Sequence, residues 1–387
     1  MKTSHFPLFV SKLAAIGALA PIGTLISLAA ESSAGQWDAS PALFVPFWQG
    51  DTMTGESALF LKDAEGGEAR ASTVFPIERL LEIRNAAGDV VYEEGRDYTW
   101  RRGAREIVLP AGSRIVSSAP EDLRVPHDSQ RYKLTHRDGK SEILFGAKLE
   151  YHALQASITY THKPGLWPVP APRFDEKALP HTIAKLRQRR LARIVVLGDS
   201  ISTGRNASGW AQGAPFQPAY PDLLKLRLQS AYEAPVKLAN LSVNGKNAHW
   251  GASMVEKVVA EKPHLVVVAF GMNDAAGRST EDFRKDLESI VAGVRKGLPE
   301  SEFILVAGML GNADWPRLNQ GSFREFRDAM AALCEPGIAL ADLTSVWAEF
   351  LKRKKFSDLT GNGVNHPNDF GHRVYAQVIG ALLVPED

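Results

Sequence analysis

The stretch that decides the fold is Arg193-Ile194-Val195-Val196-Leu197-Gly198-Asp199-Ser200-Ile201-Ser202, an apolar run that ends in a short polar segment. Residues 265–269 and 303–307 form two more continuous apolar runs. Such runs are typical of parallel strands buried on both faces of a sheet. Between them, residues 282–294 carry apolar side chains at helical spacing. This alternation predicts a three-layer α/β/α domain over residues 191–387.

Residues 37–165 show a different pattern, in which short β-like runs are separated by Gly, Pro and Asp. In residues 154–160, Leu154, Ala156, Ile158 and Tyr160 alternate with polar side chains, as in a half-buried strand. Many short strands with regular turn signals predict a β-sandwich, similar to a jelly roll. The following Pro-rich stretch resists both helix and central strand, so residues 166–190 are predicted to be a linker and lead-in. Further strands are expected at 80–84, 90–92, 98–100, 106–109 and 143–145.

The first thirty residues differ from the rest of the chain. Lys2 and Lys12 precede a run of apolar and small residues that ends in small-x-small patterns. This order predicts a secretory signal peptide over about residues 1–30, and hence a secreted or periplasmic protein without stable membrane insertion after cleavage. The alternative is an uncleaved anchor, although the run is short for a span and contains Pro21.

Charge and cysteine content argue against a nucleic-acid-binding protein and against a fold held by internal disulfides. The formal net charge is +1, which gives no electrostatic footprint for nucleic acid. The only cysteine, Cys334, cannot form an internal disulfide, and its apolar neighbours predict that it is buried. The histidines of the first 165 residues show no metal-ligand spacing, so no metal site is expected.

Polar residues follow the predicted parallel strands in a pattern that fits ester hydrolysis. Ser200 stands at the carboxyl end of a strand, where α/β folds place their ligands. Gly245 would allow a backbone amide to approach a substrate, and Asn273 follows a second buried strand. Together with the Ser200 amide they could stabilise an oxyanion. His366, just before the last predicted helix, could take the serine proton.

The segments that carry these four residues resemble, in the same order, the four blocks of the SGNH hydrolase superfamily, also called GDSL esterases. The resemblance covers about residues 190–385. It implies a flavodoxin-like sheet, no cofactor, and acyl-ester hydrolysis through an acyl-enzyme. It also implies that Ser200 is the nucleophile, that His366 is the base, and that Gly245 and Asn273 are oxyanion donors.

One position departs from that family. Its members usually carry an Asp three residues before the catalytic His, and here that position is Gly363. Asp358, Asn362 or a backbone carbonyl could orient His366 instead, and we expect a Ser–His dyad with carbonyl support. A second pair, Asp369 with His372, has the Asp-x-x-His spacing. His366 is preferred because the His-Pro-Asn of the superfamily falls on it.

These observations predict an exported esterase that removes short acyl groups, acetyl in the first place, from a carbohydrate. Export, the β-rich region and the missing Asp make the chain similar to carbohydrate acetyl esterases that carry an N-terminal β-domain. The alternatives are a lipid- or thioester-directed hydrolase and a non-catalytic glycan-binding protein on this scaffold. His249 and Trp250 either line the pocket or simply pack.

Overall fold

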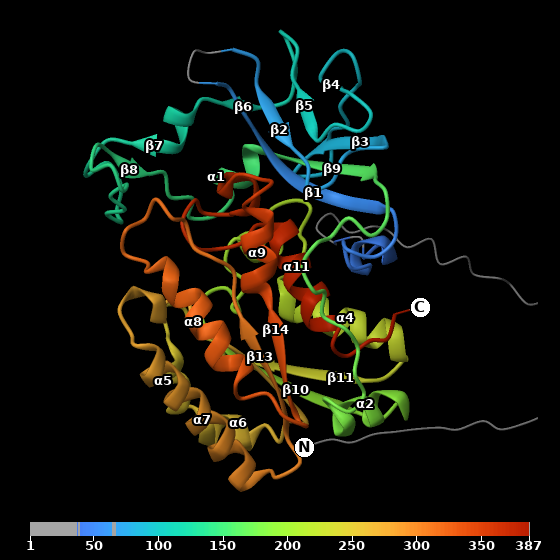
Figure 1. Cartoon of the computed structure of the whole chain (residues 1–387), viewed down its shortest axis with the longest axis vertical. Coiled ribbons are helices and arrows are strands. Elements are labelled where there is room, and N and C mark those ends of the chain that lie inside the picture. Colours follow the sequence, from blue (N-terminus) through green and yellow to red (C-terminus); the bar gives the residue numbers. More distant parts are fainter. Residues whose placement is uncertain (1–36, 38, 64–66, 387) are drawn as a thin grey trace, which may run out of the picture. The chain divides into compact units, whose positions relative to one another are not determined.

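The computed structural model describes residues 37, 39–63 and 67–386, so the predicted signal peptide lies outside the described residues. The described residues form one compact unit (Figure 1). The division into 37–165, 166–190 and 191–387 stays a prediction, and the predicted linker contains a helix at Pro180–Arg187. No helix among the described residues is long and apolar enough to cross a membrane.

The α/β part is built on five parallel strands: β10 (Ala192–Gly198), β11 (Val236–Asn240), β12 (Leu265–Ala269), β13 (Glu302–Ala307) and β14 (Ile338–Asp342). Their order in the sheet is β11-β10-β12-β13-β14. In this flavodoxin-like order, the first and third strands of the fold, β10 and β12, are neighbours whose chains leave in opposite directions. The predicted parallel α/β sheet is therefore confirmed.

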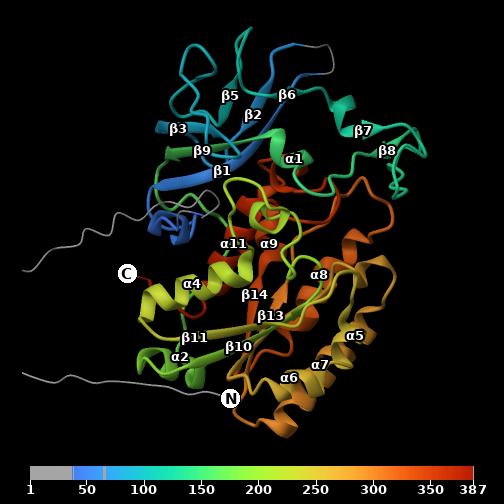
Figure 2. The ribbon, with the colours of Figure 1, turned by 180° about the vertical axis from the view of Figure 1, so that it is seen from behind.

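Helices cover both faces of this sheet (Figures 1 and 2). On one side α4 (Tyr220–Tyr232) packs against α11 (Asp369–Gly380) and α2 (Pro180–Arg187). On the other, α7 (Thr280–Gly297) packs against α5 (Ala248–Ala252), α6 (Val255–Ala260) and α8 (Gln320–Ala331). The predicted apolar face of α7 is buried, and the Ser279 side chain caps its start by accepting from the Asp282 amide. Two shorter helices after β14, α9 (Leu343–Phe350) and α10 (Phe356–Leu359), lead towards the loop that carries His366.

The N-terminal part is β-rich, as predicted. Its larger sheet has the order β3-β9-β1-β2-β5-β4, with β6 beside β1, and most of its pairs are antiparallel. A jelly-roll-like sandwich stays a prediction, and the expected strand at 90–92 is only an isolated bridge. The strands are β1 (Thr52–Leu61), β2 (Arg70–Ser72), β3 (Arg79–Asn85), β4 (Thr99–Trp100), β5 (Glu106–Val108), β6 (Ser117–Ser118) and β9 (Gln155–Thr161), with β7 (Arg124–Val125) and β8 (Glu142–Ile143) as a separate pair.

The central strand β1 joins the two parts of the chain. Its Glu56 and the Lys354 of the segment before α10 form a fully buried ion pair at 2.6 Å. Lys354 also donates to the carbonyl of Ser72, at 2.7 Å. The Pro-rich connection packs as well, since the Trp167 ring meets the ring of Phe47 edge-on. One hydrophobic core accordingly runs through both parts.

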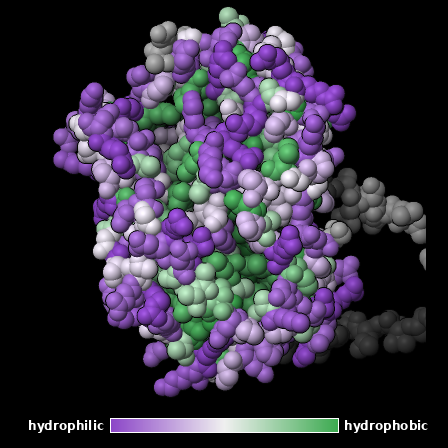
Figure 3. Space-filling view, in the orientation of Figure 1, coloured by the Kyte–Doolittle hydropathy of each residue, from purple (hydrophilic) through white to green (hydrophobic). Residues whose placement is uncertain are grey.

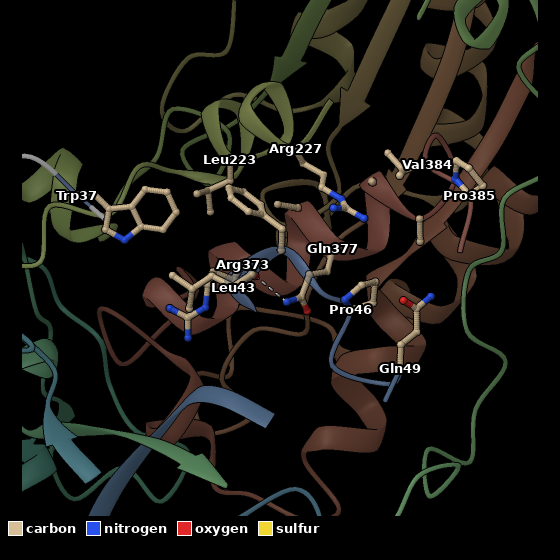
Figure 4. Close-up of a pocket in the computed structure, with 14 residues that line it drawn as sticks. Trp37, Leu43, Pro46, Gln49, Leu223, Arg227, Arg373, Gln377, Val384 and Pro385 are labelled. Atoms are coloured by element: carbon tan, nitrogen blue, oxygen red, sulfur yellow. Dashed lines mark hydrogen bonds between the residues drawn. The ribbon is translucent and has the colours of Figure 1, made fainter. Parts of the chain in front are cut away.

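The surface is mixed in hydropathy on the face seen in Figure 3. In Figure 3 hydrophilic side chains dominate the rim of the face, and hydrophobic ones gather in its central and lower part. A pocket lies between the 3₁₀ helix η1 (Pro41–Phe44), α4 and α11, and it is lined by Trp37, Leu223 and Gln377 among others (Figure 4). None of the predicted site residues lines it. Cys334 is exposed rather than buried, because it follows the end of α8 at the surface, so that prediction is wrong.

Candidate active site

The turn after β10 places Ser200 at the carboxyl edge of the sheet. A Cβ on Gly198 would lie 2.6 Å from the carbonyl oxygen of Ala269 and closer still to the Ser202 hydroxyl, so only glycine fits there. The Ser200 carbonyl then accepts from the Arg205 amide at 3.1 Å and from the Thr203 hydroxyl at 2.9 Å. Ser200 thereby stands between β10 and β12, at the switch point where such sheets bind ligands.

The structure brings Ser200 and His366 together. The Ser200 hydroxyl lies 2.9 Å from Nε2 of His366, across 166 positions of the chain. His366 belongs to the loop between α10 and α11 and is only 9% exposed. This distance lies within the range in which a base accepts a nucleophile's proton.

The other ring nitrogen of His366 faces two asparagines. Its Nδ1 lies 2.8 Å from Oδ1 of Asn206 and 3.0 Å from Nδ2 of Asn362. Asn206 has a left-handed backbone with φ 64°, a conformation that Asn tolerates better than most residues. No motif or spacing in the sequence singles out Asn206, whereas Asn362 is one of the expected orienting groups.

The expected carbonyl support at Nδ1 is absent among the described contacts, and Asp358 does not reach His366. Asp358 is buried and accepts from the Leu59 amide at 2.8 Å and from the Lys355 amide at 3.0 Å. It holds β1 and the start of α10 together. The prediction of a dyad with carbonyl support is therefore wrong, because a side-chain oxygen occupies the place of the carbonyl.

The second candidate pair is not assembled. Asp369 accepts from the Ser208 amide at 2.8 Å at the start of α11. His372 lies inside that helix, where Nδ1 accepts from the Tyr220 amide at 3.4 Å and Nε2 contacts the Arg205 carbonyl at 3.2 Å. Both nitrogens of His372 are thus used to join helices and turns.

Gly245 and Asn273 lie near each other at the same edge of the sheet. The loop after β11 is tied to the end of β10, because the Val243 amide donates to the Gly198 carbonyl at 3.1 Å. Gly245 is exposed with φ 73°, and a Cβ there would meet nothing within 4 Å. Nδ2 of Asn273 donates to the Lys246 carbonyl at 2.8 Å and faces a carboxyl oxygen of Asp199 at 3.5 Å. The second hydrogen of the Asn273 side-chain amide therefore points towards Asp199, which directly precedes Ser200.

Burial sets the charges of this site. It lowers the pKa of His366 to about 3, with further lowering by the Arg205 cation and by His372. Burial also raises the pKa of Asp199 to about 7 and that of Asp274 to about 6. His366 is consequently a neutral imidazole at neutral pH, which is the form that can accept a proton.

The rim of the site is polar. The guanidinium of Arg205 stacks over the Trp210 ring, 4.4 Å from its centroid. The side-chain nitrogen of Asn244 donates to the Thr203 hydroxyl at 2.6 Å, and its side-chain oxygen accepts from the Arg205 guanidinium. His249 is exposed and contacts Asp286, so it does not line the site through the contacts described. Among the described residues, no group of three or more His, Cys, Asp or Glu side chains could hold a metal ion.

Residues 196–374 match the family model described as the GDSL-like Lipase/Acylhydrolase family. The expected resemblance to the GDSL esterases is confirmed. The matched GDSL region contains Ser200, Gly245, Asn273 and His366, and it also contains Asn206. A search of curated proteins found no match.

Several solved esterases are similar to the chain. A two-domain esterase (CEX) active on acetylated mannans is 20% identical, with a TM-score of 0.44 over 54% of this chain and 52% of that one. An acetyl xylan esterase, AlAXEase, is 20% identical, with a TM-score of 0.38 over 48% of this chain and 97% of that one. The lipase/acylhydrolase from Enterococcus faecalis is 25% identical, with a TM-score of 0.39 over 49% and 93%. The chain spans about half the length of the two-domain esterase.

Proposed function

We propose that the chain is an exported serine esterase that removes short acyl groups, acetyl above all, from a carbohydrate, with Ser200 as nucleophile and His366 as general base. The observation that carries the proposal is the 2.9 Å contact between the Ser200 hydroxyl and Nε2 of His366. The predicted signal peptide and the jelly-roll-like character of residues 37–165 belong to the same proposal.

The reaction follows from the positions of these groups. The Ser200 oxygen attacks the ester carbonyl carbon while its proton passes to Nε2 of His366. The Asn273 side-chain amide, once its long 3.5 Å contact with Asp199 gives way to the substrate, the Gly245 amide and the Ser200 amide stabilise the negative oxygen that forms. The imidazolium then protonates the departing sugar oxygen, which leaves an acyl group on Ser200. Water, deprotonated by the same histidine, releases the acid and restores the hydroxyl.

The polar surroundings support a hydroxylated substrate over a lipid. The side chains near Ser200 and its loops that are at least partly exposed include two amides and a guanidinium: Asn273, Asn244 and Arg205. Such groups offer hydrogen bonds to sugar hydroxyls and little apolar surface to a long acyl chain.

The test is acetate release from acetylated xylan, pectin, mannan and peptidoglycan, with p-nitrophenyl esters of two to twelve carbons as a chain-length series. We expect acetate release from at least one polymer and the highest kcat/KM at two carbons. Ser200→Ala should reduce turnover by a factor on the order of 10⁶, as for the nucleophile of a serine hydrolase.

Other outcomes would contradict parts of this proposal. A maximum at eight or more carbons would identify a lipid-directed hydrolase. Binding of a glycan without turnover of any ester would identify a binding protein on this scaffold. Activity of Ser200→Ala above a tenth of the wild-type value would exclude Ser200 as nucleophile.

A further inference from the structure

We propose that Asn206 is the positioning residue for His366, in place of the usual aspartate, and that the β-rich N-terminal part sets the orientation of Asn206. This inference rests on the proposed serine-esterase function. It concerns a Ser–His–Asn arrangement in which the third member is a neutral amide held by backbone carbonyls.

The orientation of the Asn206 amide is fixed by three acceptors. The two hydrogens of its Nδ2 are shared among the carbonyls of Gly146 at 3.2 Å, Lys148 at 3.0 Å and Gly361 at 3.0 Å. A flipped amide would turn its oxygen towards three other oxygens, with no hydrogen between them. Oδ1 therefore has only one direction left, and it faces Nδ1 of His366 at 2.8 Å.

This contact determines the tautomer of His366. An amide oxygen only accepts, so Nδ1 must carry the ring hydrogen for the contact to be a hydrogen bond. Nε2 is then left with its lone pair facing the Ser200 hydroxyl. That is the tautomer that can accept the proton of the nucleophile.

The contact with Asn362 alone would favour the opposite tautomer, in which Nδ1 of His366 carries no hydrogen. The other contacts of the two asparagines favour a protonated Nδ1. Oδ1 of Asn362 accepts from the amides of Val364, Asn365 and His366 at 2.9–3.1 Å, which fixes Nδ2 near Nδ1. Nδ2 of Asn362 has two hydrogens and donates one of them to the Asn365 side chain at 3.0 Å, so it keeps a partner in either tautomer of His366. Oδ1 of Asn206 has no donor other than His366 among the described residues. If Nδ1 accepted from Asn362, a buried oxygen of Asn206 would stay unpaired, at a cost of about 1–3 kcal/mol.

The same carbonyls explain why an amide stands here. An aspartate at position 206 would turn its second oxygen towards the carbonyls of Gly146, Lys148 and Gly361. Two of these belong to the segment just before α1 (Glu150–Ala153), in the N-terminal part. The Gly146 amide also donates to the Asn362 carbonyl at 3.1 Å. The N-terminal part thus contacts both asparagines that flank His366.

The first experiment compares Asn206→Ala with Asn312→Ala in p-nitrophenyl acetate hydrolysis. Asn312 is a matched control, because its Nδ2 donates to the Gly363 carbonyl of the same loop at 2.8 Å without a described contact to His366. We expect Asn206→Ala to lower kcat by about 10²–10⁴ with KM changed less than threefold, since loss of the correct tautomer costs about 10⁴ in a serine protease. Asn312→Ala should lower kcat less than about threefold.

The second experiment uses Asn206→Asp and the acid limb of the pH dependence of kcat/KM. A carboxylate beside Nδ1 favours the imidazolium, so the apparent pKa of that limb should rise by at least one unit relative to the wild-type enzyme. A residue that only supported the loop would leave the limb in place. An unchanged limb in a folded Asn206→Asp variant would overturn the proposal.

The third measurement needs no variant at position 206. In full-length protein carrying ¹⁵N-histidine, the His366 signals are assigned by their loss in His366→Gln. We expect Nδ1 to be protonated and Nε2 to be the unprotonated nitrogen at pH 7. A protonated Nε2 would overturn the proposal whether or not the variants fold. This readout does not depend on ester turnover, so an inactive wild-type protein would reject the proposed function and leave the role of Asn206 to be decided by the spectrum.

Discussion

Replacing Glu56 by glutamine should destabilise the protein strongly, because it leaves a cation buried without its main partner. Nζ of Lys354 lies 2.6 Å from Oε1 of Glu56, and both side chains are fully buried. The glutamate also accepts from the Tyr160 hydroxyl at 2.7 Å and from the Val74 amide at 2.9 Å. A glutamine keeps the size of the side chain but not its charge.

The expected loss follows from these contacts. Removing one partner of a buried ion pair typically costs about 3–5 kcal/mol. Asp358 lies 3.8 Å from Lys354, too far for a hydrogen bond but near enough for attraction, and the Ser72 carbonyl still accepts from Nζ. We therefore expect Glu56→Gln to lower the free energy of unfolding by about 3 kcal/mol, the lower end of that range.

The assay is urea unfolding followed by circular dichroism and by tryptophan fluorescence. The surface pair Arg284–Glu288 provides the control, since Glu288→Gln should cost less than about 1 kcal/mol. The double variant Glu56→Leu with Lys354→Met should lose less than Glu56→Gln alone, because it removes the unpaired charge. A loss below about 1 kcal/mol for Glu56→Gln would refute the view that this pair joins the two parts of the chain.

Two further predictions concern the site. Asn273→Ala should reduce kcat by about 10²–10³ with a smaller change in KM, as for the loss of one oxyanion donor. Steady-state kinetics would check this. A change confined to KM would mean that Asn273 only positions the substrate. Because burial lowers the pKa of His366 to about 3, the histidine stays neutral as the pH falls from 7 to 5, and its protonation should contribute no acid limb to kcat/KM over that interval. Burial raises the pKa of Asp199 to about 7, so an acid limb near 6.5, the ordinary histidine value, would contradict the second prediction if it persisted in Asp199→Asn.

The α/β part could be predicted from the sequence because its signals are local. Burial is visible directly in the apolar run of residues 193–197 and in the helical spacing of apolar side chains in residues 282–294. Ser200 and His366 belong to recognisable sequence segments. Asn206 could not be found in this way. Its role depends on a left-handed turn and on carbonyls at positions 146, 148 and 361, which no spacing in the sequence brings together.

The central strand β1 was missed for a related reason. Its sequence contains Gly55 and the charged Glu56 in positions that the structure buries, so it does not show the alternation of a half-buried strand. Gly55 has φ 62°, and its carbonyl accepts from the buried guanidinium of Arg373, 318 positions away. A strand that buries a polar residue can be predicted only when the distant partner of that residue is known.

Gly363 bears on how the surroundings of His366 could change over evolution. It stands where related enzymes usually carry their acid, and a Cβ there would lie 2.5 Å from the Leu144 carbonyl and 2.6 Å from the Tyr151 ring. The segment around Tyr151 has filled the room that an aspartate would need. Restoring the aspartate by a single substitution would therefore meet a steric barrier, and it would have to be preceded by a retreat of that segment, which also holds Asn206. A change from the asparagine arrangement to the aspartate arrangement would therefore need more than one substitution.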